Sequence, residues 1–253
     1  MNEAILGARE QRGQECAGLS AHGVHEIVVP VDGSHRCERV LPLAIALARV
    51  LNAEVALVRT YEQPQYVPSG SALLFTRSRV QRAPLHQASL YLARLEETLR
   101  ARAVRVRSLL YQWPLADALL ACMAGGPSDL LILLGETPGA QGESRDTGTI
   151  QQVLRETRSA VLLLTAARAD ALVRSELRGP HMRMLPETVT DDGQELAERL
   201  GHILHGSPTT LDTKDVDVVA LTASGGDSHQ RMEQIERALW LLRTGNGAVL
   251  VVP

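Results

Sequence analysis

The segment EIVVPVDGS, residues 26–34, contains an unbroken apolar run that ends in Asp-Gly-Ser. A short apolar run without polar alternation is typical of a strand buried on both faces, as in the interior of a parallel sheet. Comparable runs occur later in the chain, in SDLLILLG at residues 128–135 and in SAVLLLTA at residues 159–166. These runs therefore predict a parallel sheet that is covered by helices on both faces.

Helical patterns separate the predicted strands. Ser34 can cap a helix whose apolar face repeats at helical spacing through Val40, Leu41, Ala44, Leu47 and Ala48. The first strand is predicted at residues 26–31, and further strands at 54–60 and 104–111. Helices are predicted at 84–102, 114–124 and 149–157, and a Pro/Gly/Ser-rich loop at 63–78. This alternation predicts right-handed crossovers and an α/β fold with an open, doubly wound, parallel five-stranded sheet.

The second part of the chain repeats part of this plan. We predict strands at residues 181–185, 216–223 and 247–253, with helices at 190–205 and 229–245. The segment VDVVALTA resembles SDLLILLG, and GAVLVVP resembles SAVLLLTA, whereas IVVPVDGS has no copy. We interpret this part as a truncated α/β half-domain packed against the first. The predicted division is a flexible leader (1–24), a complete domain (25–166), a linker (167–180) and a partial second domain (181–253).

Composition narrows the class of function. The net charge of -3 and the 3% of aromatic residues argue against nucleic acid as a partner. Lys214 is the only lysine, so a Walker-type GK[ST] loop is absent. Cys16, Cys37 and Cys122 are too widely spaced for a disulfide framework or a zinc site. With no signal-peptide pattern and no apolar run of about 20 residues, we expect a cytoplasmic protein without a membrane span.

The sequence resembles the universal stress protein family in several segments. These are IVVPVDGS, the helix ERVLPLAIALARVL, DLLILLG, the following loop that ends in Gly-Thr, and VLRETRSAVLLL. The resemblance covers residues 26–166 in full and, in degenerate form, residues 181–253. It implies an α/β fold with strand order 3-2-1-4-5, often dimeric or in tandem, and nucleotide binding in some members.

Members that bind ATP carry the pattern G-x2-G-x9-G-[ST] after the fourth strand. Here Gly135 fits the first position and Gly148-Thr149 the last two, whereas Pro138 stands at the second glycine and is followed by Gly139. Gly135 would let the backbone approach a ligand without a Cβ in between. Gly148 and Thr149, opening a helix, would offer N–H groups and a hydroxyl to phosphate. Alternatively, Thr149 only caps its helix and Gly135 only makes a turn.

The resemblance also implies that Pro30, Val31 and Asp32 face adenosine, together with Thr60 at the end of the second predicted strand. Asp32 follows the first strand, beside the point where strand order would reverse, and open α/β sheets bind ligands there. The alternative role for Asp32 is to cap the turn that follows the strand, together with Ser34.

The interior of the loop is less favourable for phosphate. Pro138 lacks an N–H, and one charge-assisted hydrogen bond is worth roughly 1.5–3 kcal/mol, so binding would weaken by about one to two powers of ten unless Gly139 replaces it. The loop also carries three acids against one arginine: Glu136, Glu143, Asp146 and Arg145. These acids would repel a triphosphate, although a bound Mg²⁺ could use one of them.

The leading hypothesis is an ATP- or adenine-nucleotide-binding regulatory module of the stress response, with Mg²⁺ as a companion of ATP. The alternative is a nucleotide-free interaction or scaffold module of the same fold. No set of residues makes a persuasive general acid/base pair, so we expect no enzyme, with slow ATP hydrolysis as a third reading.

The partial second domain at residues 181–253, called the second unit below, is predicted to pack against the first domain. Its loop SGGDS, residues 224–228, is too short for the nucleotide pattern, so we expect no nucleotide there, and Asp227 or Ser228 would cap the next helix. In family dimers the fifth strands can pair across a two-fold axis. We expect AVLLLTA and AVLVVP to pair in the same way within one chain, which would cover an exposed strand edge. A homodimer is a further expectation.

Overall fold

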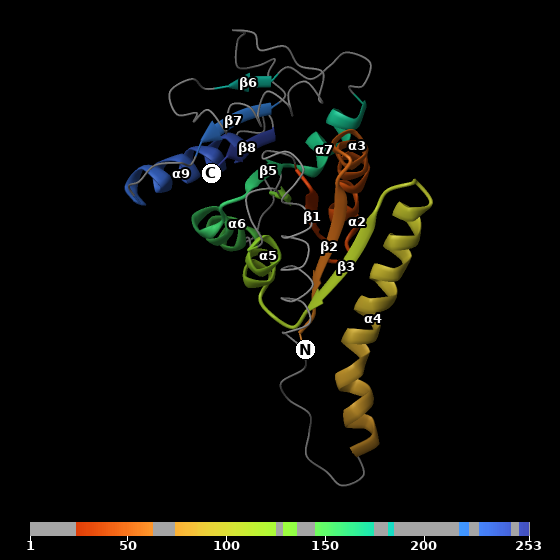
Figure 1. Ribbon diagram of the computed structural model, residues 1–253. Helices are drawn as coiled ribbons and strands as arrows, with labels where there is room; N and C mark the ends of the chain where they lie inside the picture. The colour runs from red at the N-terminus through yellow and green to blue at the C-terminus, as the bar shows by residue number, and fades with distance from the viewer. Residues whose placement is uncertain are drawn as a thin grey trace.

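The computed structural model describes residues 24–62, 74–124, 129–135, 145–174, 182–184, 218–222, 228–243 and 248–252. Figure 1 labels its elements. The strands are β1 (Glu26–Pro30), β2 (Glu54–Thr60), β3 (Val106–Tyr111), β4 (Asp129–Leu134), β5 (Ala160–Leu164), β6 (Met182–Met184), β7 (Val218–Thr222) and β8 (Ala248–Val252). The helices are α2 (His35–Glu38), α3 (Leu41–Leu51), α4 (Leu74–Arg100), α5 (Leu115–Met123), α6 (Arg145–Glu156), α7 (Ala166–Arg174) and α9 (Ser228–Arg243).

All described strands belong to one eight-stranded sheet with the order β3-β2-β1-β4-β5-β8-β7-β6. The first five strands are mutually parallel and confirm the expected order 3-2-1-4-5. Strand β8 then pairs with β5 in the antiparallel direction, and β7 and β6 continue in parallel from β8. The second unit therefore extends the sheet of the first edge to edge.

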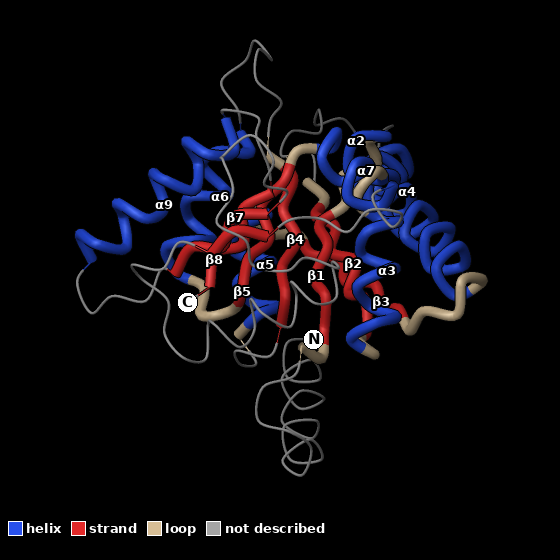
Figure 2. The backbone as a smooth tube through the Cα atoms, turned by 90° about the horizontal axis from the view of Figure 1, so that it is seen from above, coloured by secondary structure: helices blue, strands red, loops and turns tan. Residues whose placement is uncertain are grey.

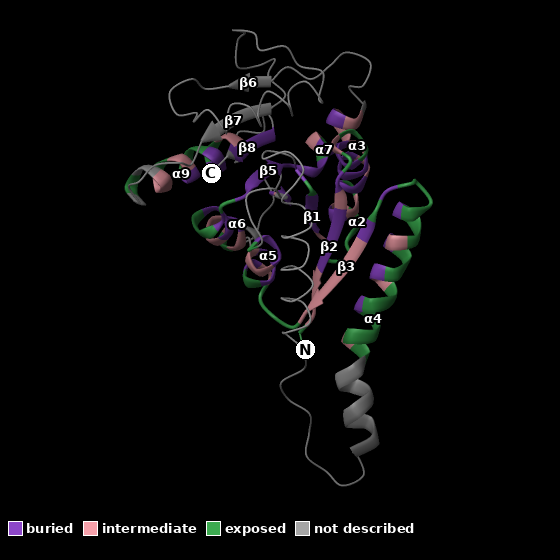
Figure 3. Cartoon of the chain, in the orientation of Figure 1, coloured by how far each residue is buried: buried purple, intermediate pink, exposed green. Residues whose placement is uncertain are grey.

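Helices cover both faces of the sheet, as the unbroken apolar runs predict (Figure 2). Adjacent residues of β1 point to opposite faces, so Val29 packs in the core beneath α3 and α4, whereas Val28 packs in the core beneath α5 and α6. Helices α2, α3, α4 and α7 lie on the first face, and α5, α6 and α9 lie on the second. The central strands are buried between these two layers (Figure 3).

Three predicted helix boundaries differ from the structure. Helix α4 begins at Leu74, not at Pro84, because the chain tolerates Pro84 inside the helix at the cost of one backbone hydrogen bond. The helix expected after Ser34 is divided into α2 and α3, and Pro42 stands in the first turn of α3. Helix α6 begins at Arg145, four residues before Thr149. The helix predicted at residues 190–205 lies outside the described residues.

The contact between the two units confirms the expected strand pairing. Leu162 of β5 lies opposite Leu250 of β8, and the pairs on either side, Val161 with Val251 and Leu163 with Val249, are arranged symmetrically around them. The strand–helix–strand connection of β7, α9 and β8 parallels that of β4, α6 and β5. The interpretation of the second unit as a degenerate repeat, and the predicted domain limits, stay predictions.

The predicted linker at residues 167–180 differs from the structure in its first part, which is helix α7. Ala169 and Leu172 of α7 are buried, and the helix packs against α3 on the first unit. None of the helices within the described ranges is long and apolar enough to cross a membrane.

Candidate functional site at the carboxyl ends of the central strands

A cavity of about 170 Å³ lies at the carboxyl ends of β1 and β4. These strands are neighbours in the sheet, but the chain leaves them on opposite faces, through α2 and α3 after β1 and through α6 after β4. Open α/β sheets bind ligands at such a switch point. The apolar part of the lining consists mainly of Pro30, Val31, Val40, Ile132, Leu133 and Ile150.

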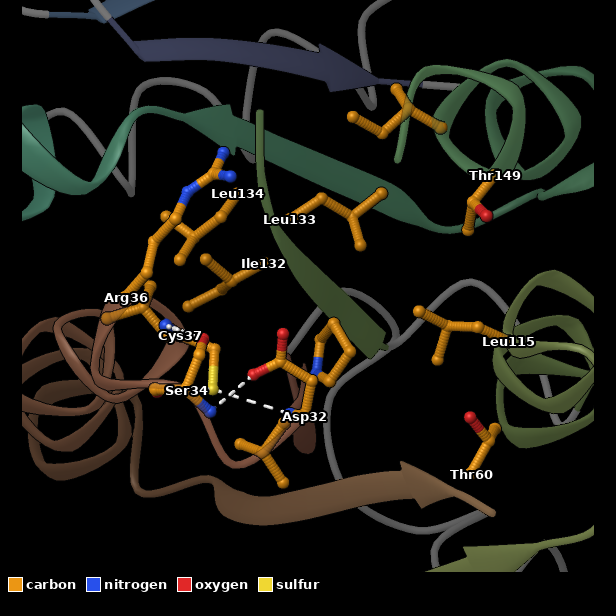
Figure 4. A pocket seen from close by; sticks show the side chains of 14 residues that line it. Asp32, Ser34, Arg36, Cys37, Thr60, Leu115, Ile132, Leu133, Leu134 and Thr149 are labelled. Carbon is orange, nitrogen blue, oxygen red and sulfur yellow. Dashed lines mark hydrogen bonds between the residues drawn. The ribbon is translucent and has the colours of Figure 1, made fainter. Parts of the chain in front are cut away.

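The turn after β1 places Asp32 beside this cavity. The Val31 N–H donates to the Val58 carbonyl at 2.8 Å, so the strand pairing continues to the residue before Asp32. The Asp32 Oδ1 atom accepts the Ser34 N–H at 2.7 Å, and the Ser34 Oγ atom accepts the Cys37 N–H at 3.3 Å as the N-cap of α2. The turn-capping role of Asp32 is thus confirmed, while its carboxylate also lines the cavity (Figure 4).

Gly33 is favoured in this turn chiefly by its backbone conformation. Its φ of +90° lies in a region that residues with a Cβ rarely adopt. In addition, a Cβ on Gly33 would lie 2.9 Å from the Nη1 atom of Arg59. The Arg59 guanidinium is packed over the ring of Tyr91, 4.5 Å from its centroid, so the back of the turn is filled.

The charge state of the turn follows from its hydrogen bonds. Burial raises the pKa of the Asp32 carboxyl, but hydrogen bonds from Cys37 and Ser34 lower it by more, so the pKa lies below its ordinary value. Burial and the neighbouring Asp32 carboxylate raise the pKa of the Cys37 thiol. At neutral pH, Asp32 is therefore ionised and Cys37 is a protonated thiol, which donates to the Ser34 carbonyl at 3.1 Å.

Arg36 is a site residue that the sequence interpretation missed. It lies on α2 in the opposite wall from Thr149 and lines the cavity (Figure 4). Its Nη2 atom donates to the Gly135 carbonyl at the end of β4. Asp32 and Arg36 are the two formally charged residues of the lining as described. The available signal was the position of Arg36, four residues after Asp32 and in the first turn of a helix that begins at the sheet edge.

The structure brings five of the predicted site residues together. Pro30, Val31 and Asp32 enter the cavity from the end of β1, Thr60 from the end of β2, and Thr149 from α6. Their role in binding stays a prediction. Gly139 lies outside the described residues, as do Pro138 and the rest of residues 136–144.

The two remaining glycines differ from expectation. Gly135 is buried and its N–H donates to the Leu164 carbonyl at 2.9 Å, but a Cβ on Gly135 would lie 2.1 Å from a side-chain carbon of Leu242 on α9. Packing against the second unit therefore explains this glycine. Gly148 is exposed, and a Cβ there would meet nothing within 4 Å.

The prediction that Gly148 and Thr149 open a helix is wrong. Helix α6 begins at Arg145, so both residues lie in its second turn. The backbone N–H groups that a helix leaves without an internal partner are those of its first turn, here residues 145–147. Thr149 thus contributes its side chain to the cavity, rather than the open end of a helix.

Within the described part of the chain, no three His, Cys, Asp or Glu side chains gather in a way that could hold a metal ion. Of the loop acids, Glu136 and Glu143 lie outside this part, and only the backbone of Asp146 is described, in α6. The expectation about Mg²⁺ therefore stays a prediction.

Comparisons with known proteins place the fold. The model of the Universal stress protein family matches residues 23–165. A protein of universal stress type from Pseudomonas aeruginosa UCBPP-PA14 has a TM-score of 0.52 and 13% identity, over 90% of this chain and 93% of that chain. A universal stress protein from Archaeoglobus fulgidus DSM 4304 has a TM-score of 0.50 and 12% identity, over 90% and 77%.

A universal stress protein solved in complex with cAMP gives a TM-score of 0.38 and 19% identity, over 58% of this chain and 99% of that chain. No curated protein matches the sequence. The two likenesses that extend over 90% of the chain show a shared fold that continues through the second unit. Since the family model covers more than half of the sequence, from the residues before β1 to the end of β5, the chain belongs to the universal stress protein family.

Proposed function

We propose that this chain is a regulatory module of the stress response that binds an adenine nucleotide in the cavity between β1 and β4. It would act through ligand-dependent contacts with other proteins, without turnover. The observation that carries the proposal is that Asp32 and Arg36 both line one mainly apolar cavity at the switch point of the sheet.

The two charges suit different parts of a nucleotide. An ionised carboxylate only accepts hydrogen bonds, so Asp32 suits the ribose hydroxyls or the amino group of the base. A guanidinium only donates and matches phosphate oxygens in geometry and charge, so Arg36 suits the phosphate. The apolar walls and the hydroxyls of Thr60 and Thr149 then complete a lining that fits a flat base and a sugar.

The size of the cavity favours partial enclosure. Its volume of about 170 Å³ is below the roughly 300–1,000 Å³ of pockets that enclose a drug-sized ligand. We therefore propose that the nucleoside part occupies the cavity and that a longer phosphate chain extends out of it, past Arg36.

A nucleotide-free interaction module is the second candidate, and one observation favours it. Neither end of the glycine pattern that suggests a phosphate loop needs a phosphate, since Gly135 packs against Leu242 and α6 begins before Gly148. A chain could keep this pattern for packing after binding was lost.

The decisive experiment uses the purified full-length chain. Denaturation followed by chromatography would identify any nucleotide that copurifies, and calorimetric titration with ATP, AMP and adenosine, with and without Mg²⁺, would measure affinity. Asp32→Asn is isosteric and should weaken binding by about tenfold, the value expected for one charge-assisted hydrogen bond.

Asp117→Asn is the matched control, because Asp117 is exposed on α5, accepts a hydrogen bond from Gln152 at 3.1 Å and lies outside the cavity lining. Equal loss in both variants would contradict a role of Asp32 in binding. No binding of any of the three compounds at millimolar concentration would favour the interaction module.

A further inference from the structure

We propose that Arg36 determines the specificity of this site for a phosphate-bearing nucleotide over the free nucleoside. The inference rests on the proposed function and assigns the anion to a residue outside the glycine-rich loop. It starts from the position of Arg36, which lies on α2 yet reaches the end of β4 and bonds to the Gly135 carbonyl.

The backbone around Arg36 is held from both sides. Ser34 caps α2 by accepting the Cys37 N–H, and the Cys37 thiol donates back to the Ser34 carbonyl. These two bonds flank Arg36 and fix the start of its side chain. The bond to Gly135 fixes the other end, so the guanidinium is half-buried and positioned at the cavity wall without a ligand. Such preorganisation lowers the entropy cost of binding an anion.

The remaining lining gives a phosphate no comparable partner. Asp32 carries a negative charge and would repel it, whereas Thr60 and Thr149 offer neutral hydroxyls. The other lining residues are apolar side chains, Ser34 and the protonated thiol of Cys37. Among the described lining residues, Arg36 is therefore the cation that can distinguish a nucleotide from a nucleoside.

A phosphate can compete with the Gly135 carbonyl for the Arg36 guanidinium. The Gly135 carbonyl is a neutral acceptor, whereas a phosphate ester carries full negative charge and can accept two parallel N–H bonds from one guanidinium. The phosphate would thus bind on the α2 side of the cavity, and the opposite charge of Asp32 would direct the base and sugar away from Arg36. The negative charge of Asp32 and the positive charge of Arg36 would thus set the orientation of the ligand in the site.

The test compares adenosine, AMP and ATP by calorimetric titration of the full-length chain. The unmodified chain should bind AMP at least about tenfold more tightly than adenosine, as expected for one charge-assisted bond. Arg36→Met keeps most of the side-chain volume but removes the charge. It should lower AMP and ATP affinity by about 10- to 100-fold and leave adenosine affinity within about twofold.

Arg39→Met is the control, because Arg39 is three residues away, pairs with Asp170 on α7 and lies outside the cavity lining. It should leave all three affinities unchanged. Arg36→Lys keeps the charge without the two-pronged geometry and should lose part of the AMP preference. It also provides a second variant if Arg36→Met does not fold.

Each result has a distinct meaning. Equal affinity of the unmodified chain for adenosine and AMP would overturn the assignment of Arg36 but leave the nucleoside site in place. An AMP preference that survives in Arg36→Met would overturn it as well, since another group would then hold the phosphate. If none of the three compounds binds, the proposed function fails, and this inference fails with it.

Discussion

Replacing Gly135 by alanine should destabilise the chain through a contact with the second unit. The new Cβ would lie 2.1 Å from Leu242 Cδ2 and 3.0 Å from Leu242 Cγ. Carbon atoms normally pack at about 3.5–4.0 Å, so the methyl group of Leu242 would have to withdraw by about 1.4 Å or more. Leu242 is only 3% exposed and has little room to move. Overpacking of this kind typically costs about 1–3 kcal/mol.

The free-energy cost of the contact with Leu242 can be separated from the effect of the substitution on the backbone. The backbone of Gly135 is outside the positive-φ region, so alanine there is not strained by conformation, and Gly→Ala alone would add about 0.4–1 kcal/mol of stability by restricting the unfolded chain. The net loss should therefore be about 0–2.6 kcal/mol. In a chain that carries Leu242→Ala, which itself costs about 2–5 kcal/mol, Gly135→Ala should be neutral or stabilising.

The assay is urea unfolding of the unmodified chain, both single variants and the double variant, followed by circular dichroism. The double-mutant cycle should give a coupling energy of about 1–3 kcal/mol. Gly148→Ala is the control: it adds a methyl group at an exposed helical position with nothing within 4 Å, and should stabilise the chain by about 0.5–1 kcal/mol.

Two results would refute this reasoning. One is an equal cost of Gly135→Ala with and without Leu242, which would show that the two side chains do not collide. The other is a Gly135→Ala chain of normal stability that binds AMP more weakly. That outcome would restore the sequence-based interpretation, in which the glycine lets a ligand approach the backbone.

Three further predictions concern other parts of the molecule. Glu26→Gln should cost about 3 kcal/mol in urea unfolding, because Glu26 is buried in a two-pronged ion pair with Arg107; a loss below about 1 kcal/mol would contradict a structural role of the pair. The pKa of Asp32 is lowered in the folded chain, so its ionised form stabilises the fold above the unfolded-state value of about 4, and this contribution disappears as the pH falls through the lower folded value. Asp32→Asn should accordingly weaken the pH dependence of stability in the acid range, and an unchanged pH profile would refute this sign. A chain that ends at Arg174 keeps α7 but exposes the edge of β5, so it should dimerise or aggregate in ultracentrifugation; a soluble monomer would argue against the packing role of the second unit.

The sheet could be predicted from the sequence because its strands carry local signals. The apolar runs around Val28 and Leu162 define strands that are buried on both faces, and the structure confirms β1 and β5 there. The sequence predicts helix α4 only from Pro84 onward, and proline favours the first turn of a helix. The structure shows that this local preference did not decide the helix start, which lies at Leu74.

Apart from Thr149, which the glycine pattern indicated, the site could be predicted only where its residues lie at the end of a strand. Asp32 and Thr60 come after β1 and at the end of β2, so their meeting at one sheet edge follows from parallel strands. Arg36 was missed because its partner Gly135 is 99 positions away in the sequence. The packing of Gly135 could not be predicted for the same reason, because the atom that excludes a Cβ belongs to Leu242, in a helix of the second unit.

The second unit contacts β5 and also the end of β4 and helix α6, which contribute one wall of the cavity. Strand β8 pairs with β5, Leu242 packs on Gly135 at the end of β4, and Arg231 of α9 donates to the carbonyls of Leu154 and Thr157 at 3.1 and 2.5 Å, where α6 ends. Those carbonyls would otherwise have no partner within the helix, so Arg231 acts as a cap supplied from the second unit.

The opposite wall comes from β1, β2 and α2, and Arg36 of this wall is joined to the contact region through its bond to the Gly135 carbonyl. A ligand that touches Asp32, Arg36 and Thr149 together would bridge a wall that the first unit holds alone and a wall that the second unit helps to hold. If attachment of the second unit sets the spacing of the two walls, a ligand that prefers one spacing changes the stability of that attachment by the same coupling free energy. Binding in the cavity and attachment of the second unit are therefore expected to be thermodynamically linked, although α9 and β8 supply no residue to the described lining.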